Sequence, residues 1–133
     1  MAPSKPGDGS STRPAGAEFL FEHTTDCIVE GSLQDGQPVV HRVNDAFETV
    51  FGYDRDRIRG ESLNDFIVPE DRVEEATRFD RRTAANKPNT ELVTRMTAQG
   101  PREFLYRGIP YDRDGGQYAF AIYTDLSDQR RYE

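Results

Sequence analysis

The order of the periodic patterns along the chain most constrains its fold. Two short strand-like segments, residues 26–31 and 38–43, precede a helical region from Asn44 to about Ala85, and three further strand-like segments follow it. Strands at both ends with helices grouped between them indicate an α+β fold built on one mostly antiparallel sheet. The 133 residues suffice for one domain of ordinary size and leave little room for a second core.

The beginning of the chain differs from the rest. Residues 1–16 are dominated by Pro, Gly and Ser and have no apolar period, so we expect a disordered tail there. Residues 17–133 then form the single folded domain. The chain stops a few residues after the last predicted strand, which is typical of a fragment or of a truncated stand-alone domain.

Charge and composition exclude several classes of protein. Asp and Glu number 24 against 17 basic residues, so the net charge is −7, and direct nucleic-acid binding is disfavoured because phosphate contacts need a basic face. The sequence contains no run of about 18 apolar residues that could span a membrane, and we expect no secretory signal. The single cysteine, Cys27, cannot form an internal disulfide or a Cys-rich metal site. A cytoplasmic location is favoured.

The basic residues are almost all arginines, with Lys5 and Lys87 as the two exceptions. An acidic surface poor in lysine is typical of proteins from salt-loving archaea or bacteria, where salt screens the repulsion between surface charges. A GC-rich genome that favours arginine codons explains the same bias equally well, so both interpretations stay open.

Capping signals define the predicted helices. Asn44 is a good N-cap and Gly52 is placed to end the helix that follows it. Two short helices are predicted over residues 54–60 and 62–66. A longer helix opens at Pro69, a natural first helical position.

Three strands are predicted after these helices. The first, residues 90–98, alternates so that Leu92, Thr94 and Met96 share one face. The other two, residues 103–111 and 118–125, flank a hairpin loop. The last strand is apolar on both sides, so we expect both of its faces to be covered.

Six segments follow one another in a familiar order: Phe19–Ile28, Val43–Phe47, Phe51–Tyr53, Ile58–Gly60, Phe66–Arg72 and Asp125–Glu133. The first has a Leu-Phe-Glu turn before an Asp-x-Ile strand. Together these segments resemble PAS domains, and the last is similar to the Asp-Ile-Thr-Glu-Arg sequence that ends many family members. The resemblance covers about Phe19 to Glu133 in the right order and spacing.

The resemblance implies a five-stranded antiparallel sheet with helices packed on one face and a site for a small ligand or cofactor between them. It also implies a sensory role, in which a change in the pocket is passed to an attached effector. Family members commonly form homodimers and occur in two-component histidine kinases, transducers and transcription regulators.

The candidate pocket residues are mostly apolar with a few polar tips, as ligand sites usually are. For any single one of them, a place in a densely filled core is the favoured interpretation. Tyr123 is the exception, because its family position faces inward and a buried hydroxyl needs a partner. The candidates are Phe47, Phe51, Phe66, Val73, Ala76, Leu92, Thr94, Tyr106, Ala121 and Tyr123.

Two further roles follow from the resemblance. Asp125 stands where the sheet ends and an outgoing helix would begin, so it is the candidate for signal output; a purely structural helix cap is the alternative. A face for dimer contacts or for the N-terminal cap is predicted from the apolar residues at the two ends of the domain. These residues are Phe19, Leu20, Phe21, Phe120 and Ile122.

The resemblance also limits which cofactors the domain is expected to bind. Light-sensing members carry a reactive cysteine in a Gly-x-Asn-Cys-Arg-Phe segment, and here Leu63 stands at the cysteine position, which excludes a cysteinyl-flavin adduct. Haem is disfavoured because the long helix, over residues 68–86, has no histidine. We expect Cys27 to be an inert core residue and no metal site, because the histidines and cysteine are too few.

Two functions remain. The first is a sensory or regulatory domain that binds a small ligand, and the second is a ligand-free module for dimerisation or protein interaction. A small enzyme using the same cavity is disfavoured, because the sequence has no Ser-His, Cys-His or metal constellation. The acidic residues around Glu70 and Glu74 have a simpler explanation as a solvated helix start.

Overall fold

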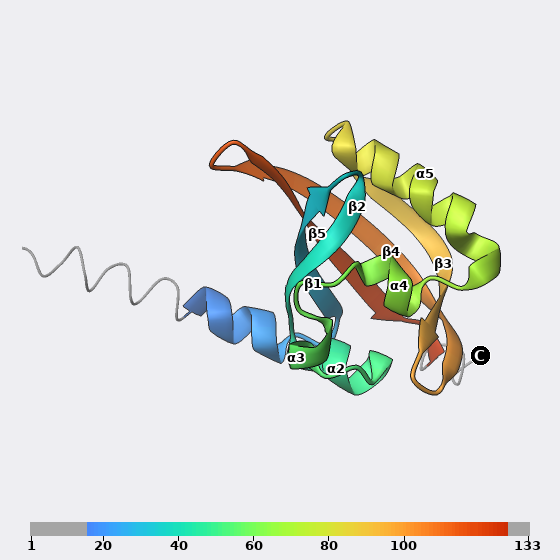
Figure 1. The fold of residues 1–133 in the computed structure, drawn as a ribbon. Helices are drawn as coiled ribbons and strands as arrows, with labels where there is room; N and C mark the ends of the chain where they lie inside the picture. The colour runs from blue at the N-terminus through green and yellow to red at the C-terminus, as the bar shows by residue number, and fades with distance from the viewer. Residues whose placement is uncertain (1–15, 128–133) are drawn as a thin grey trace, which may run out of the picture.

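Five antiparallel strands form one sheet in the order β2-β1-β5-β4-β3. The computed structural model describes residues 16–127. Of the predicted tail over residues 1–16, Gly16 lies at the start of a helix and the rest is outside the described part. Figure 1 shows α4 and α5 lying across one face of the sheet, as the PAS resemblance implied. The strands are β1 (Cys27–Gln34), β2 (Gln37–Val43), β3 (Asn89–Thr97), β4 (Gly100–Arg113) and β5 (Gly116–Asp125).

The helices lie in the order that the sequence predicted. An N-terminal helix, residues 16–23, precedes the first strand. The remaining helices separate β2 from β3 and are α2 (Asp45–Phe51), α3 (Arg55–Ile58), α4 (Leu63–Ile67), the 3₁₀ turn η1 (Glu70–Arg72) and α5 (Val73–Ala84).

Capping explains most of these boundaries. Gly52 ends α2 in the left-handed conformation, with a φ of 83°. The side chain of Asp54 caps α3, whereas Ser62 precedes α4 without a side-chain cap bond. Pro69 opens the 3₁₀ turn rather than the long helix, so the prediction that the long helix begins there is wrong by one turn: α5 starts at Val73.

Asn44 joins four segments of the fold. The residue is fully buried. Its side-chain oxygen accepts hydrogen bonds from the backbone N–H groups of Phe47, at 3.0 Å, and Ile28, at 2.9 Å. Its amide donates to the carbonyl oxygens of Phe21 and Asp26, both at 2.9 Å. One side chain therefore caps α2 and ties it to β1 and to the N-terminal helix.

The hairpin of β1 and β2 requires a glycine at its bulge. The pairing register shifts between Glu30 and Gly31. A Cβ atom on Gly31 would run into the backbone carbonyl of Val39 on β2. Glycine therefore lets the two strands approach closely at this bulge.

β3 presents the opposite face to the helices from the one expected. Val93 and Arg95 share the face that is buried beneath the helices, and an ion pair with Glu75 of α5 neutralises the buried charge of Arg95. Leu92 is 70% exposed on the outer face. Leu92, Thr94 and Met96 share one face, as predicted, but that face is the outer one, so Leu92 and Thr94 do not point toward the helices.

Replacing Asn44 by alanine should destabilise the domain strongly. Two backbone donors and two backbone acceptors would lose their partner, which costs about 1 kcal/mol or more for each buried group. We therefore expect the free energy of unfolding to fall by about 4 kcal/mol or more. Ser62→Ala is the matched control, because that N-cap makes no cap bond, and it should cost less than about 1 kcal/mol. Urea unfolding followed by circular dichroism measures both. Equal losses in the two variants would contradict the junction role.

Candidate functional site

A cavity lies between the sheet and helices α4 and α5. It offers about 50 Å³ to the centres of water-sized molecules, whereas one water needs roughly 10–15 Å³ by that measure. The cavity thus has room for a few waters or for a ligand of a few heavy atoms. Much of its wall is apolar and comes from residues such as Val29, Val40, Leu63, Ala119 and Ala121.

Stacked aromatic rings form one wall of the cavity. The ring centroids of Tyr106 and Tyr123 are 5.4 Å apart, and Phe79 of α5 lies 5.4 Å from Tyr106. Burial raises the pKa of Tyr106 to about 12 and also raises that of Tyr123, so both hydroxyls stay protonated at neutral pH. A Cβ atom on Gly108 would clash with the Tyr106 hydroxyl, so glycine makes room for this ring.

Asn89 fastens the end of α5 to β3 beside the Tyr106 hydroxyl. Its amide donates to the carbonyl of Phe79 at 3.2 Å and to the hydroxyl of Thr83 at 3.3 Å. Arg82 donates to the Asn89 side-chain oxygen at 2.9 Å. These contacts hold the aromatic wall and the helix in a fixed relation.

Arg95 brings a positive charge to the cavity, and that charge is paired. Its side chain is 4% exposed, and Nη1 lies 3.0 Å from Oε1 of Glu75 and 2.8 Å from the carbonyl oxygen of Thr94. Buried charges need such partners because their desolvation is costly. Glu75, which the sequence placed on a solvated face, thus reaches inward to neutralise Arg95.

Asp80 stands at the mouth of the cavity. Oδ2 accepts a hydrogen bond from the side-chain amide of Asn64 on α4 at 2.9 Å. Burial raises the pKa of Asp80 to about 6, although the bond from Asn64 and the charge of Arg95 both act to lower it. Asn64, Ala76 and Asp80 line the cavity and also an outer groove between α4, α5 and the β1–β2 turn. The two spaces therefore meet at Asp80.

Four of the ten predicted pocket residues line this cavity: Ala76, Tyr106, Ala121 and Tyr123. Phe47 and Phe51 are instead fully buried in a stacked aromatic core with Phe104. Phe66 packs at the edge of that core against the ring of Tyr53.

The other three predicted pocket residues lie away from the cavity. Val73 is 54% exposed at the start of α5, and Leu92 and Thr94 are on the outer side of β3. The prediction that these three residues line the cavity is wrong. α5 begins one turn later than the sequence indicated, and β3 turns the face with Leu92 and Thr94 away from the helices.

Several cavity residues escaped the sequence analysis. Phe79 shares the apolar face of α5 with Ala76, and this signal could have placed it in the cavity. Arg95 follows Val93 at a spacing of two, but a charged residue on an inner face is not expected without knowledge of Glu75. Nothing in the sequence marks the pairing of Asp80 with Asn64, because the two residues lie on different helices.

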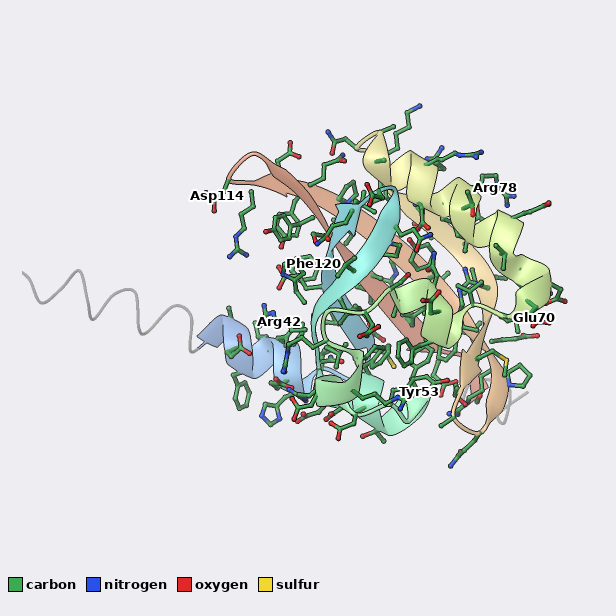
Figure 2. All side chains as sticks on the ribbon, in the orientation of Figure 1. Arg42, Tyr53, Glu70, Arg78, Asp114 and Phe120 are labelled. Carbon is green, nitrogen blue, oxygen red and sulfur yellow. The ribbon has the colours of Figure 1, made fainter. Side chains whose placement is uncertain are left out.

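The predicted dimer face divides into exposed and covered residues. Phe19 and Leu20 are 62% and 71% exposed, whereas Phe21 is buried with the Arg42 guanidinium 4.0 Å from its ring centre. Figure 2 shows Phe120 on the side of the sheet away from α5. There it stacks on Tyr111 at 5.3 Å. Ile122, which has the same parity on β5, is half-buried.

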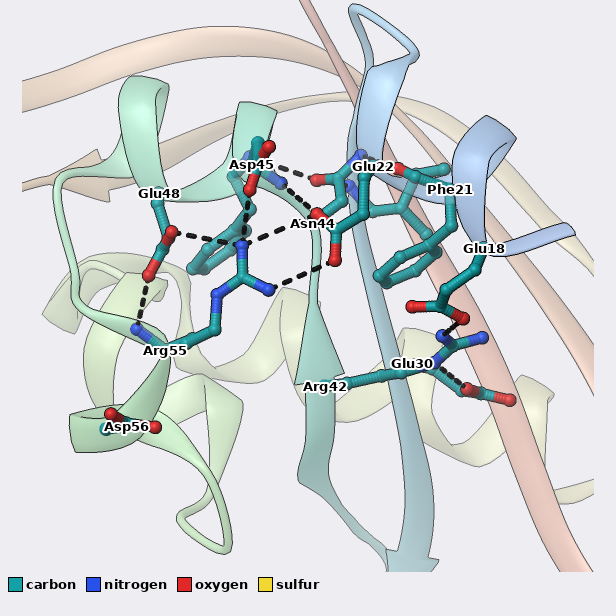
Figure 3. A network of polar contacts seen from close by, with 12 residues as sticks. Glu18, Phe21, Glu22, Glu30, Arg42, Asn44, Asp45, Glu48, Arg55 and Asp56 are labelled. Carbon is teal, nitrogen blue, oxygen red and sulfur yellow. Dashed lines mark hydrogen bonds and ion pairs between the residues drawn. The ribbon is translucent and has the colours of Figure 1, made fainter. Parts of the chain in front are cut away.

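Two arginines tether the N-terminal helix to the rest of the domain (Figure 3). Arg42 of β2 bridges Glu18, at 2.6 Å, and Glu30 of β1, at 2.7 Å. Burial would raise the pKa of Glu30, but hydrogen bonds from Tyr111 and Arg42 outweigh it and lower that pKa. The second arginine, at position 55, contacts carboxylates of the N-terminal helix and of α2: Glu22, Asp45 and Glu48.

Asp125 ends β5 with both carboxylate oxygens engaged. Oδ2 lies 2.8 Å from Nη2 of Arg102 on β4, and Oδ1 accepts a hydrogen bond from the backbone N–H of Ser127 at 2.9 Å. The carboxylate thus anchors the strand end and begins to order the segment that leaves the sheet. The continuation of that segment, residues 128–133, lies outside the described residues.

Cys27 is buried and donates to the carbonyl of Ala46 at 3.6 Å. Burial raises the pKa of its thiol to about 12, so the thiolate needed for nucleophilic chemistry is not formed at neutral pH. Within residues 16–127 no group of His, Cys, Asp or Glu side chains is arranged to hold a metal ion. Among the described helices, none is both long enough and apolar enough to cross a membrane.

Comparison with known proteins gives a consistent result. A family profile described as PAS fold matches residues 21–131. No curated protein matches the sequence. An RNA-binding light-oxygen-voltage receptor superposes with a TM-score of 0.77 at 14% identity; the match covers 90% of this chain but 35% of the receptor.

Two single-domain structures match over nearly their whole length. The PAS domain of an HTR-like protein from Haloarcula marismortui has a TM-score of 0.75 and 20% identity, covering 92% of this chain and 98% of that one. A domain of a sensory box sensor histidine kinase/response regulator from Geobacter sulfurreducens has a TM-score of 0.68 and 23% identity, covering 85% and 94%. At these identities the likeness shows the fold.

Asp80→Asn should stabilise the domain at neutral and alkaline pH. Because the folded protein holds the Asp80 proton more tightly than the unfolded chain, this contribution to stability is complete below about pH 4 and is lost as the pH rises through 6. A shift from 3.8 to about 6 corresponds to roughly 2 to 3 kcal/mol. The variant keeps the bond from Asn64 and should exceed the wild type in unfolding free energy by up to that amount at pH 8, but not at pH 4.

Asp112→Asn, an exposed substitution in the β4–β5 hairpin, is the matched control and should follow the wild type at every pH. Urea unfolding of the three proteins between pH 4 and 8 provides the measurement. If the unfolding free energies of the wild type and Asp80→Asn changed with pH in parallel, the burial of this carboxyl group would be contradicted.

Proposed function

The chain belongs to the PAS fold family, and from this premise we propose that it is a non-catalytic sensory domain of a signal-transduction protein. It binds a small ligand in the central cavity and controls an attached effector. The observation that carries the proposal is the cavity itself, in which the hydroxyl-bearing rings of Tyr106 and Tyr123 meet a largely apolar wall. Ligand sites commonly combine apolar walls with a few convergent polar groups.

The ligand of this proposal is small. The cavity holds only a few heavy atoms, which favours a small molecule over a flavin or haem. Leu63, which stands at the position of the reactive cysteine in light-sensing relatives, is buried and lines the cavity. A leucine side chain has no nucleophilic atom and cannot form a thiol adduct.

The signal leaves through β5. Tyr123 of the cavity wall is two residues from Asp125, which bonds to Arg102 and to the departing segment. A ligand that shifts Tyr123 changes the strand on which Asp125 is held, provided that it binds two conformations with different affinity. The effector is a histidine kinase, a transducer or a transcription regulator, in the cytoplasm. Support comes from the similar domain of a sensor histidine kinase.

A second candidate function is homodimerisation without a ligand. Exposure of Phe19 and Leu20 on the N-terminal helix favours it, because neighbouring large apolar side chains at a surface mark interaction sites. Phe120 and Ile122 on the outer sheet face would extend the contact. The two functions are compatible, since a dimer can also carry a ligand in each copy.

Ligand binding is tested by native mass spectrometry of the protein purified from cell extract. The wild type should carry an adduct of low mass, and Ala121→Leu, which fills the cavity, should carry none. Ala85→Leu, an exposed change after α5, is the control and should retain the adduct. An adduct that survives Ala121→Leu would place the ligand elsewhere.

Dimerisation is tested by light scattering coupled to gel filtration. Phe19→Glu combined with Leu20→Glu should convert a dimer to a monomer, because charges would have to be desolvated in the interface. Val73→Glu changes an exposed apolar residue on α5 and should leave the dimer intact. A wild type that is monomeric at every concentration would remove this candidate function.

A further inference from the structure

The charges around the cavity do not balance. Arg95 is neutralised by Glu75 at 3.0 Å. The charged oxygens of Asp80 receive one side-chain hydrogen bond in the described part of the chain, and it comes from the neutral amide of Asn64. A carboxylate can accept about four hydrogen bonds. A half-buried anion with a neutral partner therefore remains at the place where the cavity meets the outer groove.

We propose that the cavity binds a small primary alkylammonium ion, with its charged head on Asp80 and its alkyl chain among the apolar residues of the cavity. The proposal rests on the ligand-binding function above and names the chemical class of the ligand. An ammonium group supplies further donors and a directly bonded positive charge, which Asn64 does not provide.

The position of Asp80 suits a charged head on an apolar tail. Because Asp80 also lines the groove, an ammonium group bound there stays partly hydrated, which lowers the cost of desolvation. The groove carries Asp35 and Asp65 against Arg81, so its charge attracts a cation toward the mouth. Beyond the mouth the alkyl chain meets Leu63 and the other apolar walls.

The remaining groups near Asp80 are consistent with this ligand. Tyr106 and Tyr123 face Asp80 from β4 and β5 and are neutral at pH 8, and their rings can interact with a cation. Arg95 from β3 repels a cation, but its charge is directed to Glu75 and its Nη1 to the carbonyl of Thr94. The cavity volume limits the alkyl chain to about three or four carbons.

The proposal predicts a dependence on pH that a neutral ligand would not show. An ammonium ion binds the deprotonated Asp80, and a proton competes with it below the pKa of about 6. The affinity should therefore fall about tenfold between pH 8 and pH 5.

The experiment is isothermal titration calorimetry with three probes of matched size: propylammonium, 1-propanol and propionate. At pH 8 only propylammonium should bind, with an affinity in the millimolar range expected for so few atoms. Asp80→Asn should lower its affinity at least tenfold. This variant is expected to be at least as stable as the wild type, so loss of folding does not explain the result. Asp112→Asn should bind as the wild type does.

Three results would overturn the proposal: no propylammonium binding at about 10 mM, equal binding by Asp80→Asn, or tighter binding of propionate or propanol. If the wild type still carries a co-purified adduct that Ala121→Leu removes, then the ligand class is wrong while ligand sensing stands. If that adduct is also missing and all three probes are ignored, the sensory function itself fails.

Discussion

The hydrogen bonds of Asn44 constrain how the β1–β2 edge of the sheet meets α2 and the N-terminal helix. Its oxygen and its amide are satisfied only when β1, the start of α2 and the N-terminal helix hold their present relation. Any shift would leave buried polar groups without partners, which costs more than the bonds themselves contribute. Because α2 is fixed in this way, Phe47 and Phe51 are held in the core.

The interior is divided between a filled end and a hollow end. Beside α2, the rings of Phe51 and Phe104 stack on each other and are fully buried. Beneath α5, small residues take their place on the sheet and the helix, and the wall there includes Gly31, Ala76 and Ala121. The same sheet thus supports a rigid core and a cavity, and the polar groups of the cavity are held by α5 and β3, far from the Asn44 junction.

Sequence patterns predicted the fold correctly where a single residue determines the local structure. Asn44 and Gly52 act through backbone groups within a few residues, so the limits of α2 could be predicted. The inner face of β3 could not, because both alternating sets contain apolar or β-branched residues and the choice depends on Arg95 meeting Glu75. The meeting of Asp80 with Asn64 depends on the packing of two helices, which no local pattern describes.

The stacked tyrosines of the cavity wall have a practical consequence. The chain contains no tryptophan, so its six tyrosines dominate the near-ultraviolet absorption and the intrinsic fluorescence. Tyr106 and Tyr123 are buried against each other at the cavity, where any occupant alters the polarity around their rings. The domain therefore carries its own optical reporter, and occupancy can be followed by spectroscopy without a dye.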